Sequence, residues 1–252
     1  MLRADVAPLL ASGLVDRRAN TPFAGAHLAF VPYCTADLHA GRAERQYQAD
    51  LLGLDIRTVH HRGKDNVDAD VAVLKARFPD VSTVFVIGAS AGGFGAVLNV
   101  DAIIAAFPAA EVHVLADGAP FVQPINGLYG TWRTQWALDF DDACVDCDAS
   151  FTKVWQHARA AHVASRFGLL TSLNDETIRL FFGYGLEDLT PQVNAVVDGD
   201  VDADNAAAFV VGGVQHVLLG NYTSMTAVDG LSLKRFVDDW ATGSAGWRTT
   251  RP

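Results

Sequence analysis

The run Val84-Phe85-Val86-Ile87-Gly88-Ala89-Ser90-Ala91-Gly92-Gly93 joins an apolar segment directly to a glycine-rich one. Residues 84–87 are β-branched or aromatic without a polar interruption, which is typical of a parallel strand buried on both faces. Residues 94–107, after the glycines, have the composition of a buried helix. This stretch therefore predicts a strand, a tight turn at Ser90 and a helix in direct succession.

Short apolar segments alternate with helical patterns along the rest of the chain, which predicts parallel strands joined by crossover helices. We expect further strands at 26–32, 56–60, 112–115, 178–184 and 207–211, and helices at 42–52, 67–77, 152–168 and 232–240. The aromatic, acidic and irregular segment 122–150 is interpreted as an insertion over one end of the sheet. No repeat or low-complexity linker divides the sequence, so a single domain over residues 1–252 is expected.

The composition excludes several classes of protein. Half of the residues are hydrophobic and 19% are charged, so the chain can bury a large core. The net charge of −10 argues against a nucleic-acid-binding protein, which would normally carry a basic patch. No stretch is long and apolar enough to predict a membrane span, and residues 1–5 (MLRAD) do not resemble a signal peptide.

Cys144 and Cys147 form a C-x-x-C motif within an acidic segment. A zinc site would need a second such pair or suitably spaced histidines, and the sequence offers neither. We therefore predict no metal and no cofactor, and we interpret the two cysteines as a local loop disulfide or as two free thiols.

Ser90 is the candidate nucleophile. A G-x-S-x-G motif between a strand and a helix is typical of a nucleophile elbow, in which small residues allow a sharp turn. Gly88, Gly92 and Gly93 would supply that room, and the start of the following helix favours developing negative charge. We expect the Ala91 N–H to donate a hydrogen bond to an oxyanion.

A serine nucleophile needs a general base, usually a histidine held by a carboxylate. His157 and His162 fall in a predicted helix, where packing or solvation is the simpler role. His216 follows the predicted 207–211 strand in a loop, which is where a catalytic histidine belongs. His216 is therefore the predicted base.

The acid should follow a strand that lies between the serine and the histidine in the chain. Asp188 follows the predicted 178–184 strand and is our first choice. Asp117, just after the predicted 112–115 strand, and Glu187 are the alternatives. For each of them, a turn residue that bonds its own backbone is the competing interpretation.

Two blocks of sequence resemble the pectin acetylesterase / Notum-like family of α/β-hydrolase carboxylesterases. They are the segments Tyr33-Cys34-Thr35-Ala36-Asp37-Leu38-His39-Ala40-Gly41 and Gly88-Ala89-Ser90-Ala91-Gly92-Gly93-Phe94-Gly95-Ala96. The resemblance implies an α/β-hydrolase fold, a mostly parallel sheet with helices on both faces. It also implies a secreted or periplasmic enzyme with a triad of Ser90, Asp188 and His216.

The chain departs from that family at its beginning, where such proteins typically have a strand and a glycine-rich loop that supplies oxyanion donors. We expect both to be missing, which leaves Ala91 as the one identified donor.

The predicted function is a serine carboxylesterase that hydrolyses acyl esters, of the acetyl type, in a polysaccharide, a polyester or another acylated substrate. The alternative is a non-catalytic binding protein with an incomplete oxyanion hole. Tyr33 and Trp132 are expected to contact the substrate, and a monomer is expected.

Overall fold

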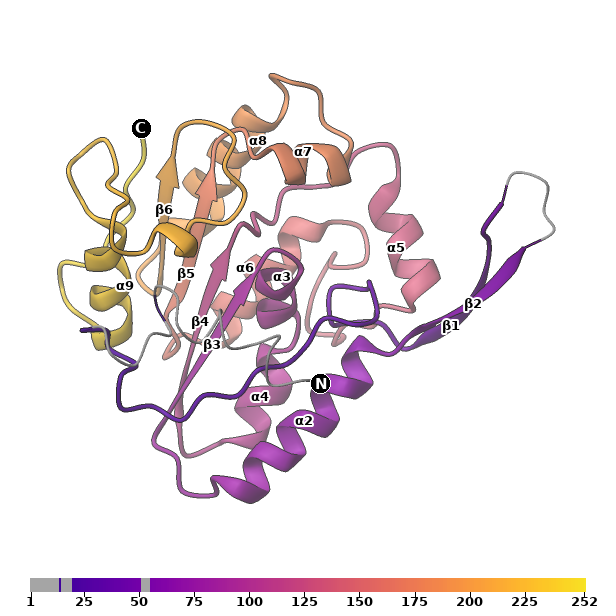
Figure 1. The fold of residues 1–252 in the computed structure, drawn as a ribbon, viewed down its shortest axis with the longest axis horizontal. Helices are drawn as coiled ribbons and strands as arrows, with labels where there is room; N and C mark the ends of the chain where they lie inside the picture. Colours follow the sequence, from indigo (N-terminus) through magenta and orange to yellow (C-terminus); the bar gives the residue numbers. More distant parts are fainter. Residues whose placement is uncertain (1–13, 15–19, 51–54) are drawn as a thin grey trace.

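A parallel sheet forms the centre of the molecule. The computed structural model describes residue 14, residues 20–50 and residues 55–252. In that part of the chain the main sheet has the order β3-β4-β5-β6 (Figure 1), with β3 at Thr83–Ala89, β4 at Glu111–Asp117, β5 at Phe167–Ser172 and β6 at Ala206–Val211. All neighbouring strands in it are parallel, so their carboxyl ends lie along one edge.

Helices cover both faces of this sheet. Alternate residues of β4 show the two sides: Val114 and Ala116 belong to one apolar core, and Leu115 belongs to a second core with Phe236 and Trp240 of α9. The helices are α2 (Gly63–Arg77), α3 (Ala91–Leu98), α4 (Val100–Ala106), α5 (Leu128–Trp136), α6 (Phe151–Ala161), α7 (Glu176–Phe182), α8 (Leu189–Val196) and α9 (Leu233–Thr242), with a π-turn at Val197–Val201 and a 3-10 turn at Leu219–Asn221. The predicted fold class, a mostly parallel sheet with helices on both faces, is confirmed.

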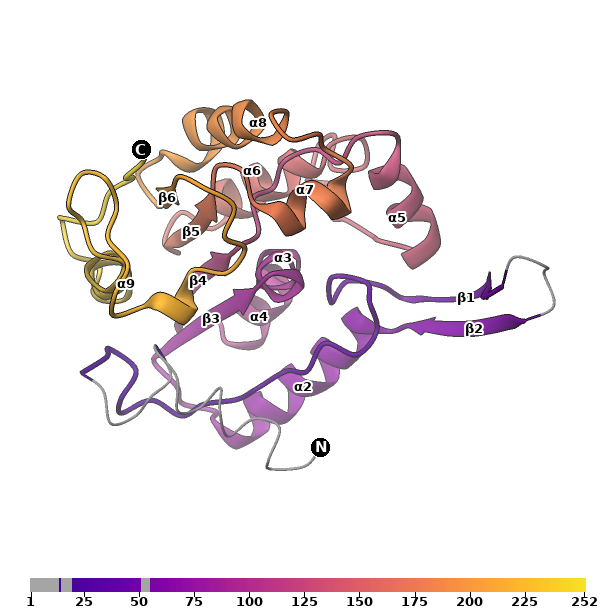
Figure 2. The ribbon, with the colours of Figure 1, turned by 45° about the horizontal axis from the view of Figure 1, so that its top comes forward.

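A two-stranded arm extends away from the sheet (Figure 2). Strands β1 (Ala43–Gln48) and β2 (Ile56–His61) pair antiparallel, with Ala43 opposite His61. The helix predicted at 42–52 is therefore wrong over β1, and its residues 51–54 lie outside the described residues. Exposure alternates along β1 with a period of two, as in a paired strand, whereas the helical prediction placed Tyr47, Leu51 and Leu52 on one side of a helix.

Two predicted strands are absent. Residues 26–32 form no strand, and the apolar side chains that suggested one, Leu28 and Phe30, stay 42% and 52% exposed. The segment predicted as a strand at 178–184 is mostly helix α7, in which Ile178 and Phe182 are buried and the intervening Leu180 and Phe181 are exposed. That spacing of four is the period of a helix.

The helix predicted at 94–107 is two helices, α3 and α4, which meet at Asn99, and the strand predicted at 56–60 lies in the antiparallel arm and not in the parallel sheet. The remaining predicted elements were found with shifted ends. The helix expected at 152–168 ends at Ala161, and residues 167–172 after it form β5. Within the described ranges, no helix combines the length and the apolar character that crossing a bilayer requires.

Candidate active site

Ser90 occupies a sharp turn between β3 and α3. Its φ of 55° lies in the left-handed region, which a non-glycine residue adopts only at a cost and which is frequent at functional sites. The backbone N–H of Ser90 donates to the Asp117 carbonyl at 2.7 Å and so ties the turn to the end of β4. This geometry is that of a nucleophile elbow.

The glycines around Ser90 are not equivalent. A Cβ atom at Gly88 would lie 2.0 Å from the Gly92 carbonyl oxygen, and one at Gly93 would lie 2.6 Å from the Ala119 Cβ. Apart from the backbone of its own helix, a Cβ at Gly92 would meet none of the described residues within 4 Å. The elbow therefore needs glycine at positions 88 and 93, and the expectation that Gly92 also provides room is wrong.

A chain of hydrogen bonds connects Ser90 to a buried carboxylate. The Ser90 Oγ lies 2.7 Å from the His216 Nε2, and the His216 Nδ1 lies 2.7 Å from the Asp175 Oδ2 and 3.0 Å from its Oδ1. Because an ionised carboxylate only accepts hydrogen bonds, Nδ1 carries the proton in neutral His216 and Nε2 is free to accept one from Ser90. The imidazole is thus oriented as a base toward the serine hydroxyl.

Asp175 has a second structural role as the N-cap of α7. Its Oδ1 accepts hydrogen bonds from the backbone N–H groups of Thr177 and Ile178, both at 2.9 Å. The side chain has no solvent exposure, so these helix N–H groups take the place of water around the negative charge. The helix terminus therefore holds the carboxylate at a fixed place beside His216.

Asp188, the acid chosen from the sequence, does not contact His216. It is exposed, and within the described residues its Oδ2 accepts only the backbone N–H of Gly185, at 3.2 Å, which is the turn role considered as the alternative. The acid is expected to follow a strand, and the relevant strand is β5 at 167–172. Asp175 is the acidic residue that follows it. Sequence reasoning missed Asp175 because it extended a helix into Phe167 and assigned the next strand to α7. The sequence feature that could have identified this strand was the apolar run Phe167-Gly168-Leu169-Leu170, which precedes Asp175.

Asp117, the second choice, also makes no hydrogen bond to the His216 ring in this structure. Its buried carboxylate accepts the backbone N–H groups of Leu218 and Leu219 in the loop that carries His216. Burial raises the pKa of Asp117 to about 6, although the two N–H groups oppose the shift.

The Ala91 N–H is placed to meet negative charge at the elbow. Ala91 is the first residue of α3, whose N-cap is Ser90. The first N–H groups of a helix lack partners within the helix and carry its partial positive charge. The position suits the oxyanion role predicted for Ala91, which stays a prediction.

Tyr33 begins a loop that is fastened to α3. Its hydroxyl accepts the Leu38 N–H at 3.0 Å, its ring lies 4.8 Å from the His39 ring, and burial raises its pKa to about 12. The His39 carbonyl accepts the Asn99 amide at 3.0 Å. With 43% of its surface exposed, Tyr33 is available to a substrate, but no described contact joins it to Ser90.

The comparison with protein families matches the pectinacetylesterase model over residues 11–147, more than half of the chain. The chain belongs to the pectinacetylesterase family. The match includes Ser90 and Asp117, and it ends before Asp175 and His216. No curated protein sequence matches this family member significantly.

Two solved structures of the Wnt deacylase Notum from Drosophila are similar to this pectinacetylesterase-family chain in fold. One has a TM-score of 0.57 at 18% identity and covers 84% of this chain and 67% of Notum. The other has a TM-score of 0.61 at 17% identity and covers 87% and 68%. At this identity the likeness concerns the fold, which is α/β-hydrolase-like.

Trp132, the second predicted substrate contact, is partly buried against other aromatic rings of α5 and α7. Its ring stacks on Trp136 at 5.3 Å and meets Phe182 edge-on at 5.2 Å. In the described residues these contacts give it a packing role, and a role in binding remains a prediction.

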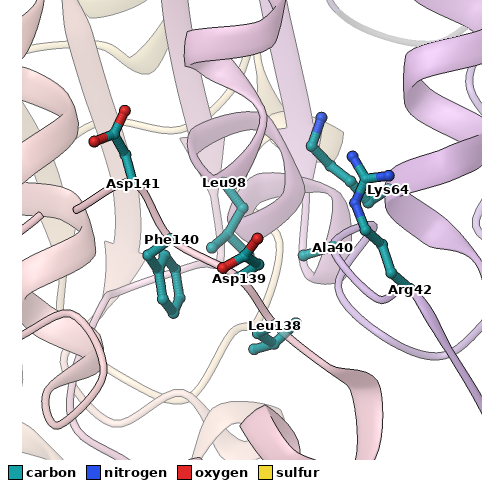
Figure 3. Close-up of a pocket in the computed structure, with 8 residues that line it drawn as sticks. All are labelled: Ala40, Arg42, Lys64, Leu98, Leu138, Asp139, Phe140 and Asp141. Atoms are coloured by element: carbon teal, nitrogen blue, oxygen red, sulfur yellow. The ribbon is translucent and has the colours of Figure 1, made fainter. Parts of the chain in front are cut away.

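A cavity of about 200 Å³, shown in Figure 3, is lined by Leu98 at the C-terminal end of α3, whereas Ser90 caps the N-terminal end of that helix. Figure 3 shows Arg42 and Lys64 on one side of it and Asp139 and Phe140 on the other. Arg42 and Lys64 are already paired with acidic residues of α2. Leu98, the last residue of α3, is among the residues that line this cavity, and Ser90 is not.

The segment 122–150 contains α5 and a disulfide between Cys144 and Cys147, the first of the two interpretations offered from the sequence. Cys147 has no solvent exposure, and Tyr129 donates from its hydroxyl to the Cys147 carbonyl at 2.5 Å. The part of the chain open to description contains no cluster of three or more histidine, cysteine or acidic side chains that could hold a metal ion.

Proposed function

We propose that this member of the pectinacetylesterase family is a serine carboxylesterase in which Ser90 is the nucleophile, His216 the base and Asp175 the residue that orients His216. The observation that carries the proposal is the unbroken set of hydrogen bonds from Ser90 to His216 and on to Asp175 at a strained elbow. A serine hydroxyl is a weak nucleophile until a base accepts its proton, and this arrangement supplies the base.

The reaction follows from the position of the protons. Ser90 Oγ attacks the ester carbonyl carbon while His216 Nε2 takes the hydroxyl proton, and Asp175 stabilises the resulting imidazolium. The Ala91 N–H and the start of α3 stabilise the oxyanion. His216 returns the proton to the departing alcohol, which leaves an acyl-enzyme, and water activated by the same histidine releases the acid.

The proposal also covers the class of substrate and the compartment in which the protein acts. The names of the similar proteins, pectinacetylesterase and Wnt deacylase, both describe removal of an acyl group. We infer an acyl ester of a polysaccharide, a polyester or another acylated molecule as the substrate. The Cys144–Cys147 disulfide supports a secreted or periplasmic protein, since disulfides persist in oxidising compartments.

The test is hydrolysis of p-nitrophenyl acetate and of longer acyl esters by the wild type, by Ser90→Ala and by Ser150→Ala. Ser150 is a matched control because its side chain makes no hydrogen bond at the cap of α6. We expect turnover in the wild type and in the control but not in Ser90→Ala, and the acyl-length preference will report the size of the acyl site.

A folded wild type without turnover, and without covalent labelling by an alkyl fluorophosphonate, would contradict the proposal. The alternative of a non-catalytic binding protein would then replace it.

A further inference from the structure

The carboxylate of Asp117 is wholly buried and has no part in the reaction as proposed. Its Oδ1 lies 2.8 Å from the Leu218 N, and its Oδ2 lies 2.9 Å from the Leu219 N and 3.1 Å from the Leu218 N. Leu218 and Leu219 follow His216 by two and three residues. The carboxylate therefore holds the backbone of the loop that carries the histidine.

The same residue is attached to the nucleophile. The Asp117 carbonyl accepts the Ser90 N–H at 2.7 Å, so one residue bonds both to the elbow and to the histidine loop. Its neighbour Gly118 packs tightly on the same loop, since a Cβ there would lie 2.3 Å from the His216 carbonyl oxygen. Asp117 and Gly118 thus join the two segments whose side chains must meet at 2.7 Å.

The charge on Asp117 is unfavourable for folding. The titratable groups that face it are His216 and Asp175, and Asp175 is a second buried carboxylate that opposes its ionisation. A buried charge is costly, and well-packed neutral side chains often stabilise a fold at least as well. An ionised carboxylate at this place therefore suggests a role beyond packing.

We propose that Asp117 is a positioning residue whose ionised carboxylate fixes the His216 loop relative to Ser90, so that the serine–histidine contact forms only when Asp117 is deprotonated. The proposal rests on the proposed esterase function. Protonation would remove the negative charge that strengthens the hydrogen bonds from the Leu218 and Leu219 N–H groups, and the proton would occupy one lone pair of an oxygen that accepts one of them. The loop would then lose a fixed point two residues from His216.

The first test compares Asp117→Asn with the control Asp188→Asn. Asparagine keeps the shape of Asp117 but turns an NH₂ group toward a backbone N–H, whereas Asp188 is exposed and bonds only Gly185. We expect kcat to fall by about 10²-fold in Asp117→Asn, as for a misplacement of about 1 Å, with KM little changed. The control should retain wild-type kinetics.

The pH profile separates positioning from general loosening of the fold. Ionisation of Asp117 should add one protonation step to the acid limb of the wild-type profile, so log kcat/KM should fall more steeply there than in Asp117→Asn, by about 1 in slope. The pKa of Asp117, about 6, places its ionisation within reach of such assays. Equal slopes in the two proteins would overturn the proposal.

A third measurement needs no turnover and compares the wild type with Asp117→Asn. The proton on His216 Nδ1, bonded to Asp175, should give a low-field NMR resonance in the wild type, assigned by its loss in His216→Ala. We expect a shift or broadening of this resonance near pH 6 in the wild type, where Asp117 is protonated, that is missing in Asp117→Asn. A resonance that stays unchanged through this ionisation overturns the positioning role. Absence of esterase turnover, with the resonance behaving as expected, overturns only the proposed function.

Discussion

At the scale of single residues, Asp175 combines two functions that are usually separate. It caps α7 through two backbone N–H groups and holds the Nδ1–H of His216 through the same carboxylate. A capping residue has its position set by the helix, so the acid needs no further support. The exposed Asp188, thirteen residues later in the chain, precedes α8 without a side-chain capping bond, and among the described residues its carboxylate accepts only the Gly185 N–H.

Asp175→Asn should separate these two functions. Asparagine caps helices about as well as aspartate, so α7 should persist, but the side-chain NH₂ can donate to His216 Nδ1 and favour the wrong tautomer. We expect kcat for p-nitrophenyl acetate to fall by about 10⁴-fold. Circular dichroism should show a native fold. Activity close to wild type would mean that Asp175 is not the orienting acid.

At the scale of elements, the β3–α3 elbow depends on the close approach of backbone to backbone. The tightest contact is between Gly88, near the end of β3, and Gly92 in the first turn of α3. Side chains at these two positions would meet different surroundings, since Gly88 faces the Gly92 carbonyl and Gly92 faces open space.

The pair Gly88→Ala and Gly92→Ala should therefore behave differently. Gly88→Ala should destabilise the protein by about 3 kcal/mol or more, because rigid backbone would have to move. Gly92→Ala should leave stability unchanged or raise it by up to about 1 kcal/mol through helix propensity. Urea unfolding of both variants measures the difference, and equal losses would contradict this view of the elbow.

At the scale of the whole molecule, one sheet separates two apolar cores. Alternate residues of the same strands enter them: Leu169 packs on the α3 side and Leu170 on the α9 side. Unfolding one core would expose one face of strands that the other core needs. We therefore propose that the chain is a single cooperative domain, with the segment 122–150 as part of the α3-side core through Tyr129 and Cys147.

Differential scanning calorimetry should accordingly show one transition, whose calorimetric and van't Hoff enthalpies agree. A Phe236→Ala substitution in the α9-side core should lower the midpoint of that single transition, with an expected loss of about 3–5 kcal/mol. Two resolved transitions, with only one shifted by Phe236→Ala, would show that the cores unfold separately.

The sequence by itself determined the elbow and the central strands. Residues 84–87 and 207–211 are continuous apolar runs, which favour strands of a parallel sheet covered on both faces. β6 is buried along nearly all of its length, whereas residues 84–87 of β3, at the end of the described strand order, are only half-buried. Ser90 and His216 were chosen as candidates by their places after these strands, Ser90 immediately after β3 and His216 five residues after the end of β6. In these two runs, the local preference for a strand and the need for apolar side chains in the packed sheet agree.

Only the tertiary structure decided which acid meets His216 and where the ambiguous elements lie. Residues 178–184 are apolar enough for either a strand or a helix, and the choice was made by the Asp175 cap and by burial of Ile178 and Phe182 on one face. Residues 43–48 became a strand through pairing with β2. A triad is a contact between residues far apart in the chain, and its members are identified only when packing brings their strand ends to the same edge of the sheet.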